Sequence, residues 1–152
     1  MKKRHYVNNV DFFNALVEFK NKTKESNEFV AIPNYIGACI NEICKRLSTK
    51  ANFVNYTYRD EMVGDAVENC VESIHGFDPE KSNNPFAYFT RIAWNAMLRR
   101  IAKEKKQTYL KYKNMQNLHL TEDAHGELHL SNDEIANEII KSFEEKLTKT
   151  PK

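Results

Sequence analysis

The sequence predicts an all-α fold. Its 152 residues include only four glycines and four prolines, fewer than the many tight turns of a β-sandwich require. Five segments carry apolar residues at the three- and four-residue spacing of amphipathic helices, and polar or turn-forming stretches separate them. We therefore expect one compact helical domain with an amphipathic C-terminal helix.

Two helices are predicted in the N-terminal third of the chain. Asn9 is the expected N-cap of a helix that ends near Lys24, and Pro33 lies at the start of a second helix over about 34–50. The apolar stripe of the first helix is Val10, Phe13, Leu16 and Val17. That of the second includes Tyr35, Ile36, Ile40, Ile43, Cys44 and Leu47.

The third and fourth helices are separated by a strong turn signal. The third covers about 59–75, and the run His75-Gly76-Phe77-Asp78-Pro79 ends it. Asn84 is the expected N-cap of the fourth and Pro85 its first residue, and no glycine or proline follows as far as Lys105.

The C-terminal part is less regular. The helical pattern weakens beyond Lys113, and residues 118–130 are assigned to no element. Ser131-Asn132-Asp133-Glu134 is a capping box, which predicts the start of a last helix. This helix packs on the rest of the chain or binds another protein in a groove. Its apolar residues recur every four positions, as Ile135, Ile139, Phe143 and Leu147.

Composition excludes several classes of protein. No apolar run approaches the ~20 residues of a membrane span, so we expect a soluble protein that stays in the cytoplasm and has no membrane partner. Cys39, Cys44 and Cys70 have no metal-ligand spacing and are expected to be reduced core residues. No His/acid pair or glycine-rich phosphate loop stands out. We therefore expect no catalytic residue, no metal and no cofactor, and the protein should not be an enzyme.

The net charge of +2 conceals three blocks of alternating sign. Residues 57–80 contain seven acidic residues and one arginine. Residues 86–113 contain eight lysines and arginines against Glu104, and residues 121–145 contain eight acidic residues against Lys141. Such segregation suggests a different partner for each surface.

The acidic block lies along one side of the third helix. On a helical wheel Glu61, Asp65, Glu68 and Glu72 fall together, at spacings that make like charges repel. The adjacent face, with Val63, Val67, Cys70, Val71 and Ile74, is expected to be buried. No Lys or Arg occurs within residues 60–75 to relieve this repulsion, which suggests a basic partner; the alternative is a plain solvated face.

The basic block interleaves cations with aromatic residues on the fourth helix. Its expected core face is Phe86, Ala93, Trp94, Met97 and Ile101, with Phe89 beside it. The opposite face carries Tyr88, Arg91, Asn95, Arg99 and Lys106, with Arg100 and Lys103 at its edges. Arginine and lysine neutralise phosphates, asparagine and arginine pair with base edges, and aromatic rings stack on unpaired bases. The alternative is an ordinary amphipathic helix with a solvated basic face.

In order and spacing, these two helices resemble region 2 of bacterial sigma factors. Glu61-Met62-Val63-Gly64-Asp65-Ala66 is similar to the family's "Asp-Leu-Val-Gln-Glu-Gly", and Phe77-Asp78 to the Phe-Asp that closes that helix. Phe86-Ala87-Tyr88-Phe89-Thr90 resembles "Phe-Ser-Thr-Tyr-Ala". The run from Arg91 to Arg100 resembles the "Arg-Ile-Ala-Arg-Asn … Leu-Arg-Arg" helix of extracytoplasmic-function sigma factors. Overall, the late-promoter sigma factors of T-even-type bacteriophages are the nearest resemblance.

The resemblance implies a minimal sigma factor with two contact surfaces. The acidic helix would dock on the β′ clamp helices of bacterial core RNA polymerase through Glu61, Asp65, Glu68, Asn69 and Glu72. The basic helix would recognise and open a minus-ten-like element of promoter DNA, with Phe89 at the base-capturing position. The DNA-contact residues would be Tyr88, Phe89, Arg91, Asn95, Arg99, Arg100, Lys103, Lys105 and Lys106.

The same resemblance implies a domain division and leaves alternatives open. Residues 1–30 would form an N-terminal helix or arm, 31–113 the region-2-like domain, and 114–152 an acidic segment with the amphipathic helix. Phe143-Glu144-Glu145-Lys146-Leu147 is the nearest substitute for the tip with which phage late sigma factors bind a DNA sliding clamp. The rival functions are a stand-alone helix-turn-helix regulator and an adaptor or anti-sigma-like protein that does not touch DNA.

Overall fold

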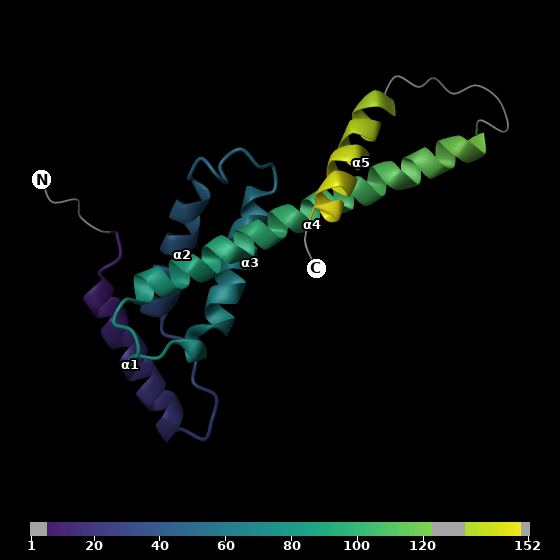
Figure 1. Ribbon diagram of the computed structural model, residues 1–152. Helices are drawn as coiled ribbons and strands as arrows, with labels where there is room; N and C mark the ends of the chain where they lie inside the picture. The colour runs from purple at the N-terminus through teal and green to yellow at the C-terminus, as the bar shows by residue number, and fades with distance from the viewer. Residues whose placement is uncertain (1–5, 123–132, 150–152) are drawn as a thin grey trace, which may run out of the picture. The chain divides into compact units, whose positions relative to one another are not determined.

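The computed structural model describes residues 6–122 and 133–149, and this part of the chain contains helices and no strand (Figure 1). The predicted all-α fold is therefore confirmed. Two compact units are formed, Met1–Arg100 and Ile101–Lys152. None of the described helices is long and apolar enough to cross a lipid bilayer. The elements are α1 (Asn9–Glu25), α2 (Asn34–Ser48), α3 (Arg59–Glu72), the 3-10 turn η1 (Ile74–Gly76), α4 (Pro85–Glu122) and α5 (Asp133–Thr148).

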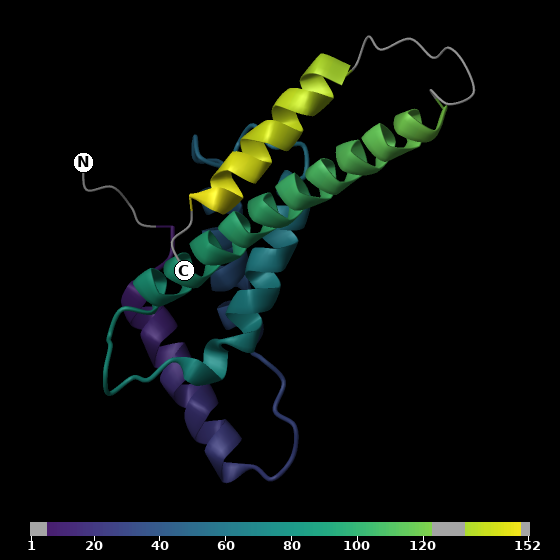
Figure 2. The ribbon, with the colours of Figure 1, turned by 45° about the vertical axis from the view of Figure 1, so that its right-hand side comes forward.

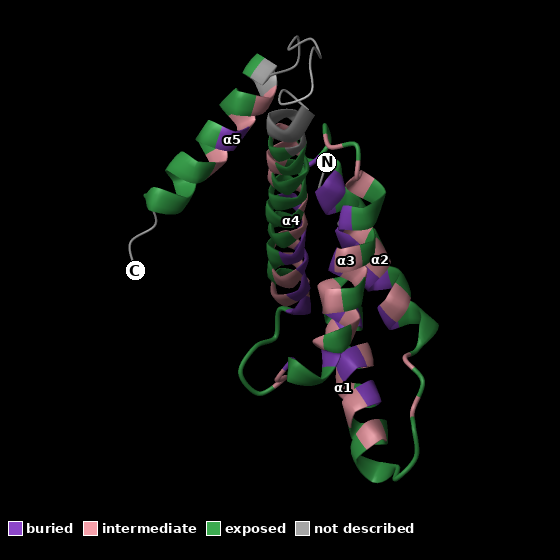
Figure 3. Ribbon diagram, turned by 90° about the vertical axis from the view of Figure 1, so that its right-hand side faces the viewer, coloured by how far each residue is buried: buried purple, intermediate pink, exposed green. Residues whose placement is uncertain are grey.

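The first unit has one apolar core, to which α1, α2, α3, η1 and the first part of α4 contribute (Figure 3). The three cysteines are free and buried, which confirms them as core residues. The Cys70 thiol donates to the Phe89 carbonyl oxygen at 3.5 Å, so even this weak polar group is partnered. The largest fully buried side chains are Phe12, Phe53, Phe77, Phe89, Leu16, Ile36, Ile40, Ile43, Met62, Ile74, Met97 and Pro85.

Helix α1 begins with a different cap and buries a different face than predicted. The Asn8 side chain, not that of Asn9, accepts the first backbone N–H groups, those of Val10 and Asp11. Val10 is 67% exposed, and the buried positions are Phe12, Leu16 and Phe19. The helix has apolar residues on more than one face, so the aromatic rings take the core and the smaller valine is left outside.

The start of α4 is tied to the start of α1 by two asparagines. Asn84 Oδ1 accepts from the Ala87 backbone N–H at 3.1 Å, which confirms Asn84 as the N-cap, and Pro85 opens the helix as predicted. Asn9 Nδ2 donates to the same Asn84 Oδ1 at 3.1 Å. Asn9 Oδ1 in turn accepts from the Phe86 backbone N–H at 3.1 Å. The residue expected to cap α1 therefore braces the first turn of α4.

Replacing Asn84 with alanine is expected to lower the free energy of unfolding by about 1 kcal/mol and the Tm by a few degrees, since the cap and the bond to Asn9 are both lost. Thermal unfolding followed by circular dichroism measures this. Asn83→Ala is the matched control, because Asn83 is the exposed neighbouring asparagine. Equal Tm values for the two variants would show that the cap contributes nothing.

Helix α3 is rotated by about one residue from its predicted orientation. Met62, Ala66 and Cys70 are fully buried, whereas the expected core residues Val63 and Val67, with Val71, are only half-buried. Two apolar stripes run side by side on this helix. The stripe with the small Ala66 and Cys70 side chains faces the core, where α3 packs on α2.

The second unit is a helical hairpin in which α5 runs back along the second part of α4 (Figures 1 and 2). Helix α4 continues to Glu122, well past the Lys113 where the sequence pattern weakens. The predicted capping residues Ser131 and Asn132, and residues 123–130 of the unassigned stretch, lie outside the described residues. Ile140, which the sequence pattern left out, is buried, whereas Leu147 of the predicted stripe is 58% exposed.

Candidate functional site

The acidic stripe predicted on α3 is present, but its members have different surroundings. Glu61, Glu68 and Glu72 are exposed to solvent, whereas Asp65 and Asn69 are half-buried. Three of the four acidic side chains are therefore available to a partner, and the fourth is engaged within the first unit.

Asp65 forms a two-pronged ion pair with Arg100 of α4. Arg100 Nε donates to Asp65 Oδ2 at 2.5 Å, and Nη2 donates to Oδ1 at 2.7 Å. The Arg100 side chain is only 18% exposed and that of Asp65 only 29%. Bidentate contacts of this kind are stronger and more directional than a single-point surface ion pair. Helix α4 thus supplies a cation to the acidic stripe of α3, and Arg100 is not held out toward solvent as a DNA contact requires.

A second pair links the same two helices. Arg99 Nη2 donates to Asn69 Oδ1 at 2.9 Å, and Asn69 Nδ2 donates to the Asp65 carbonyl oxygen at 2.8 Å. Two predicted polymerase contacts are therefore joined to two predicted DNA contacts. The wheel had placed Arg100 at the edge of its face, but a single-helix pattern cannot show which residue of another helix it meets.

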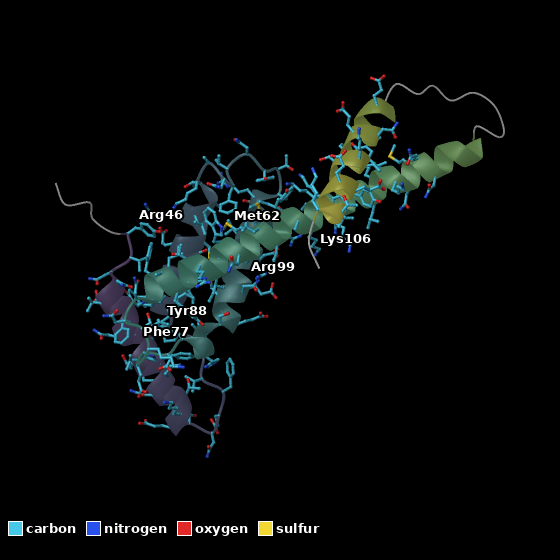
Figure 4. The ribbon with its side chains drawn as sticks, viewed as in Figure 1. Arg46, Met62, Phe77, Tyr88, Arg99 and Lys106 are labelled. Carbon is cyan, nitrogen blue, oxygen red and sulfur yellow. The ribbon has the colours of Figure 1, made fainter. Side chains whose placement is uncertain are left out.

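Most of the other predicted DNA-contact residues of α4 are exposed, including Arg99 and Lys106, which Figure 4 labels. Arg91, Asn95 and Arg99 in the first unit are exposed, and so are the three lysines of the predicted set in the second. These lysines are Lys103, Lys105 and Lys106. The predicted basic face is accordingly present on both units.

Phe89 is in the centre of the core of the first unit and not on its surface. Its exposed fraction is 0%, and its ring centroid lies 5.4 Å from that of Phe12, 6.4 Å from that of Phe77 and 5.0 Å from that of Tyr88. The placement of Phe89 as a base-capturing residue is therefore corrected. A side chain in this position supports its neighbours and cannot meet a base without leaving the core.

Tyr88 is half-buried and held by its hydroxyl. The Oη atom donates to the Ser73 carbonyl oxygen at 3.0 Å, and the ring packs edge-on against Phe77 with centroids 5.3 Å apart. Burial raises the pKa of Tyr88 above its usual range. A Cβ at Gly76 would lie 2.9 Å from this Oη atom, so the glycine leaves room for the tyrosine.

Trp94 packs within the first unit, as the sequence indicates. It is half-buried, and its ring meets that of Phe53 edge-on at 4.8 Å. Phe86, expected in the core, is also only half-buried, and its ring centroid lies 5.7 Å from that of Tyr6. Among the described residues, no group of three His, Cys, Asp or Glu side chains is placed to hold a metal.

One constellation that the sequence reading missed lies in the second unit. The Tyr109 and Phe143 rings are stacked, with centroids 4.5 Å apart and an interplanar angle of 16°. Tyr109 Oη donates to Glu144 Oε1 at 3.0 Å, and Lys113 Nζ donates to the same oxygen at 3.3 Å. These residues come from two helices that are distant in the sequence, so the pattern of either helix alone could not pair them.

Comparison with known families agrees with this geometry. No curated protein matches the sequence. Residues 42–107, which run from the middle of α2 to the lysine-rich part of α4, match the family described as Sigma-70 region 2. This match contains both the acidic helix α3 and the Asp65–Arg100 and Asn69–Arg99 pairs. The segment 42–107 is thus similar to region 2 of the sigma-70 family, whose members are transcription initiation factors.

Proposed function

We propose that this chain is a phage-type sigma factor that docks on host core RNA polymerase and opens a minus-ten-like late promoter element. The observation that carries the proposal is the Sigma-70 region 2 match over the two oppositely charged helices. An acidic helix suits a basic polymerase surface, and a basic helix suits DNA. The phage and late-promoter parts rest on the sequence resemblance.

The polymerase contact is proposed to begin at the three exposed glutamates of α3. Glu61, Glu68 and Glu72 are solvated, so a basic partner reaches them without disrupting the fold. Asp65 and Asn69 are partnered by Arg100 and Arg99 in the free protein. They would join the contact only by exchanging those partners.

The DNA contact is proposed to use the exposed face of α4. Arg91 and Arg99 reach phosphates or guanine edges, and Asn95 is suited to adenine. Of the two aromatic candidates, we assign contact with an unstacked base to Tyr88, because it is half-buried whereas Phe89 is in the core and supports its ring. Lys103, Lys105 and Lys106 extend the phosphate contacts.

Mixing the purified chain with host core polymerase tests the function directly. We expect the two to co-purify and to give run-off transcripts from a late-type phage promoter, whereas core polymerase alone gives none. Binding to promoter duplex by the chain alone, with no effect on polymerase, would instead identify a stand-alone regulator. Polymerase binding with no DNA contact would identify an adaptor.

A further inference from the structure

The second unit contains a small site that is built from α4 and filled by α5. Tyr109 offers the flat face of its ring and a hydroxyl donor, and Lys113, one turn on, offers a cation. From α5, Phe143 lies flat on the tyrosine ring and the adjacent Glu144 puts one carboxylate oxygen against both donors.

These α5 groups stand in for a familiar ligand. A planar ring next to an anion is what a nucleotide presents, as a base and a phosphate. Base stacking on an exposed tyrosine and phosphate contact with lysine are the two usual means of holding single-stranded nucleic acid. The fit of Phe143 and Glu144 shows that the ring, the hydroxyl and the ammonium group of α4 can engage such a pair together.

The titration behaviour of the site agrees with an anion-binding role. The hydrogen bond to Glu144 raises the pKa of Tyr109 above its usual range. The hydrogen bond from Tyr109, followed by that from Lys113, lowers the pKa of Glu144. The site therefore favours the charged form of the group that occupies it.

The surface beside this site is suited to a polyanion. Lys103, Lys105 and Lys106, on the turns of α4 that precede Tyr109, are all exposed, and Glu104 is the acidic residue among them. Successive cations along a helix neutralise successive phosphates. A strand held at Tyr109 and Lys113 would thus find further cations toward the start of the unit.

Helix α5 is held by contacts that a ligand could replace. Ile140 is buried among the side chains of α5 that the structure describes, and the Lys113–Glu144 ion pair is solvent-exposed, at 40% for Lys113 and 47% for Glu144. Gln116 adds one hydrogen bond to Asn137, at 3.0 Å. Exposed ion pairs and single polar contacts contribute little to stability, so these polar contacts can be exchanged for contacts with a ligand at small cost.

We propose that Tyr109 and Lys113, extended by Lys106, form a binding site for single-stranded DNA that α5 occupies in the free protein. The identity of the strand rests on the proposed function, in which promoter opening supplies a single strand. Helix α5 acts as a mimic, with Phe143 in place of a base and Glu144 in place of a phosphate. Single-stranded DNA and α5 then compete for one surface of α4.

The test uses the full-length chain and a fluorescein-labelled oligothymidylate, with anisotropy as the readout. Phe143→Ala with Glu144→Gln weakens the cover, so we expect severalfold tighter binding than wild type, because a larger fraction of the chain has a free site. Glu144→Gln alone keeps the ring stack and should give a smaller gain. Glu145→Gln is the matched control, since it removes the same charge from the neighbouring exposed position and should leave affinity unchanged.

Adding Tyr109→Ala to the Phe143→Ala, Glu144→Gln double variant, in which the cover is weakened, isolates the α4 side of the site. Loss of one stacked base predicts binding weaker by about fivefold or more. Tyr112→Ala is its control, because Tyr112 is on the same turns and lies outside the contacts with Phe143 and Glu144 that define the site.

Amide hydrogen exchange then reports displacement. On adding oligothymidylate, exchange should rise in 133–148 and not in 85–100.

The proposal is overturned by unchanged affinity in the uncovered variants, by equal effects of Tyr109→Ala and Tyr112→Ala, or by unchanged exchange in α5. Equal or tighter binding of oligouridylate would overturn single-stranded DNA as the ligand. Polymerase is absent from all of these measurements, so their failure is distinguishable from failure of the co-purification and run-off experiment. A chain that supports transcription without these effects would refute this inference alone.

Discussion

Replacing Phe89 with alanine is expected to destabilise the first unit by about 3–5 kcal/mol, the range for a large aromatic removed from a packed core. The ring is 0% exposed and touches Phe12, Phe77 and Tyr88, so its loss leaves a cavity between α1, α4 and the turn after η1. Urea unfolding followed by the fluorescence of Trp94 measures the change, because the only tryptophan lies in this unit.

Tyr88→Phe is the companion variant. It keeps the ring and removes only the hydrogen bond to the Ser73 carbonyl, so we expect a loss of about 1 kcal/mol. A change below about 1 kcal/mol for Phe89→Ala would place the ring outside the core and restore it as a base-contact candidate. Impaired promoter opening by Phe89→Ala, taken alone, would therefore not assign it to DNA.

Reversing two exposed charges of α3, with Glu61→Arg and Glu68→Arg together, is expected to abolish binding to core polymerase. If a basic surface faces them, the like charges created cost several kcal/mol, on the order of 100-fold or more in affinity. Both residues are solvated, so the free energy of unfolding should stay within about 0.5 kcal/mol per site of wild type. Co-purification and a titration against labelled core polymerase give the affinity.

The matched control reverses Glu25 and Glu28, two exposed acidic residues at and after the end of α1, and makes the same change in net charge. We expect it to bind polymerase as wild type does. Asp65 is deliberately left intact, because Asp65→Arg would face Arg100 and disturb the fold. Equal retention of polymerase by the reversed and control chains would reject α3 as the docking helix.

Much of the fold could be predicted because local signals specify it. The Asn84–Pro85 start of α4 and the turn at Gly76 depend on caps and turn residues that act within a few positions, although α3 itself ends at Glu72, before the predicted 75. The buried faces of α1 and α3 were wrong by about a residue. Both helices carry two apolar stripes, and the choice between them depends on the shape of the partner, which periodicity does not contain.

The candidate site was predicted in its residue types more than in its contacts. Helical wheels correctly predicted the acidic stripe of α3 and the basic face of α4. That Asp65 meets Arg100, and that Tyr109 meets Phe143, depends on the packing of helices distant in sequence. Phe89 was placed by resemblance to a motif; its burial follows from the three rings around it, which come from separate elements.

The Asp65–Arg100 pair has an evolutionary consequence. One member lies on the helix proposed to select the polymerase and the other on the helix proposed to read the promoter. A lineage that alters position 65 to suit a new host enzyme leaves a half-buried guanidinium without its bidentate acceptor, unless position 100 changes too. Substitutions at positions 65 and 100 should therefore arise together, because either change alone leaves the other side chain without its partner.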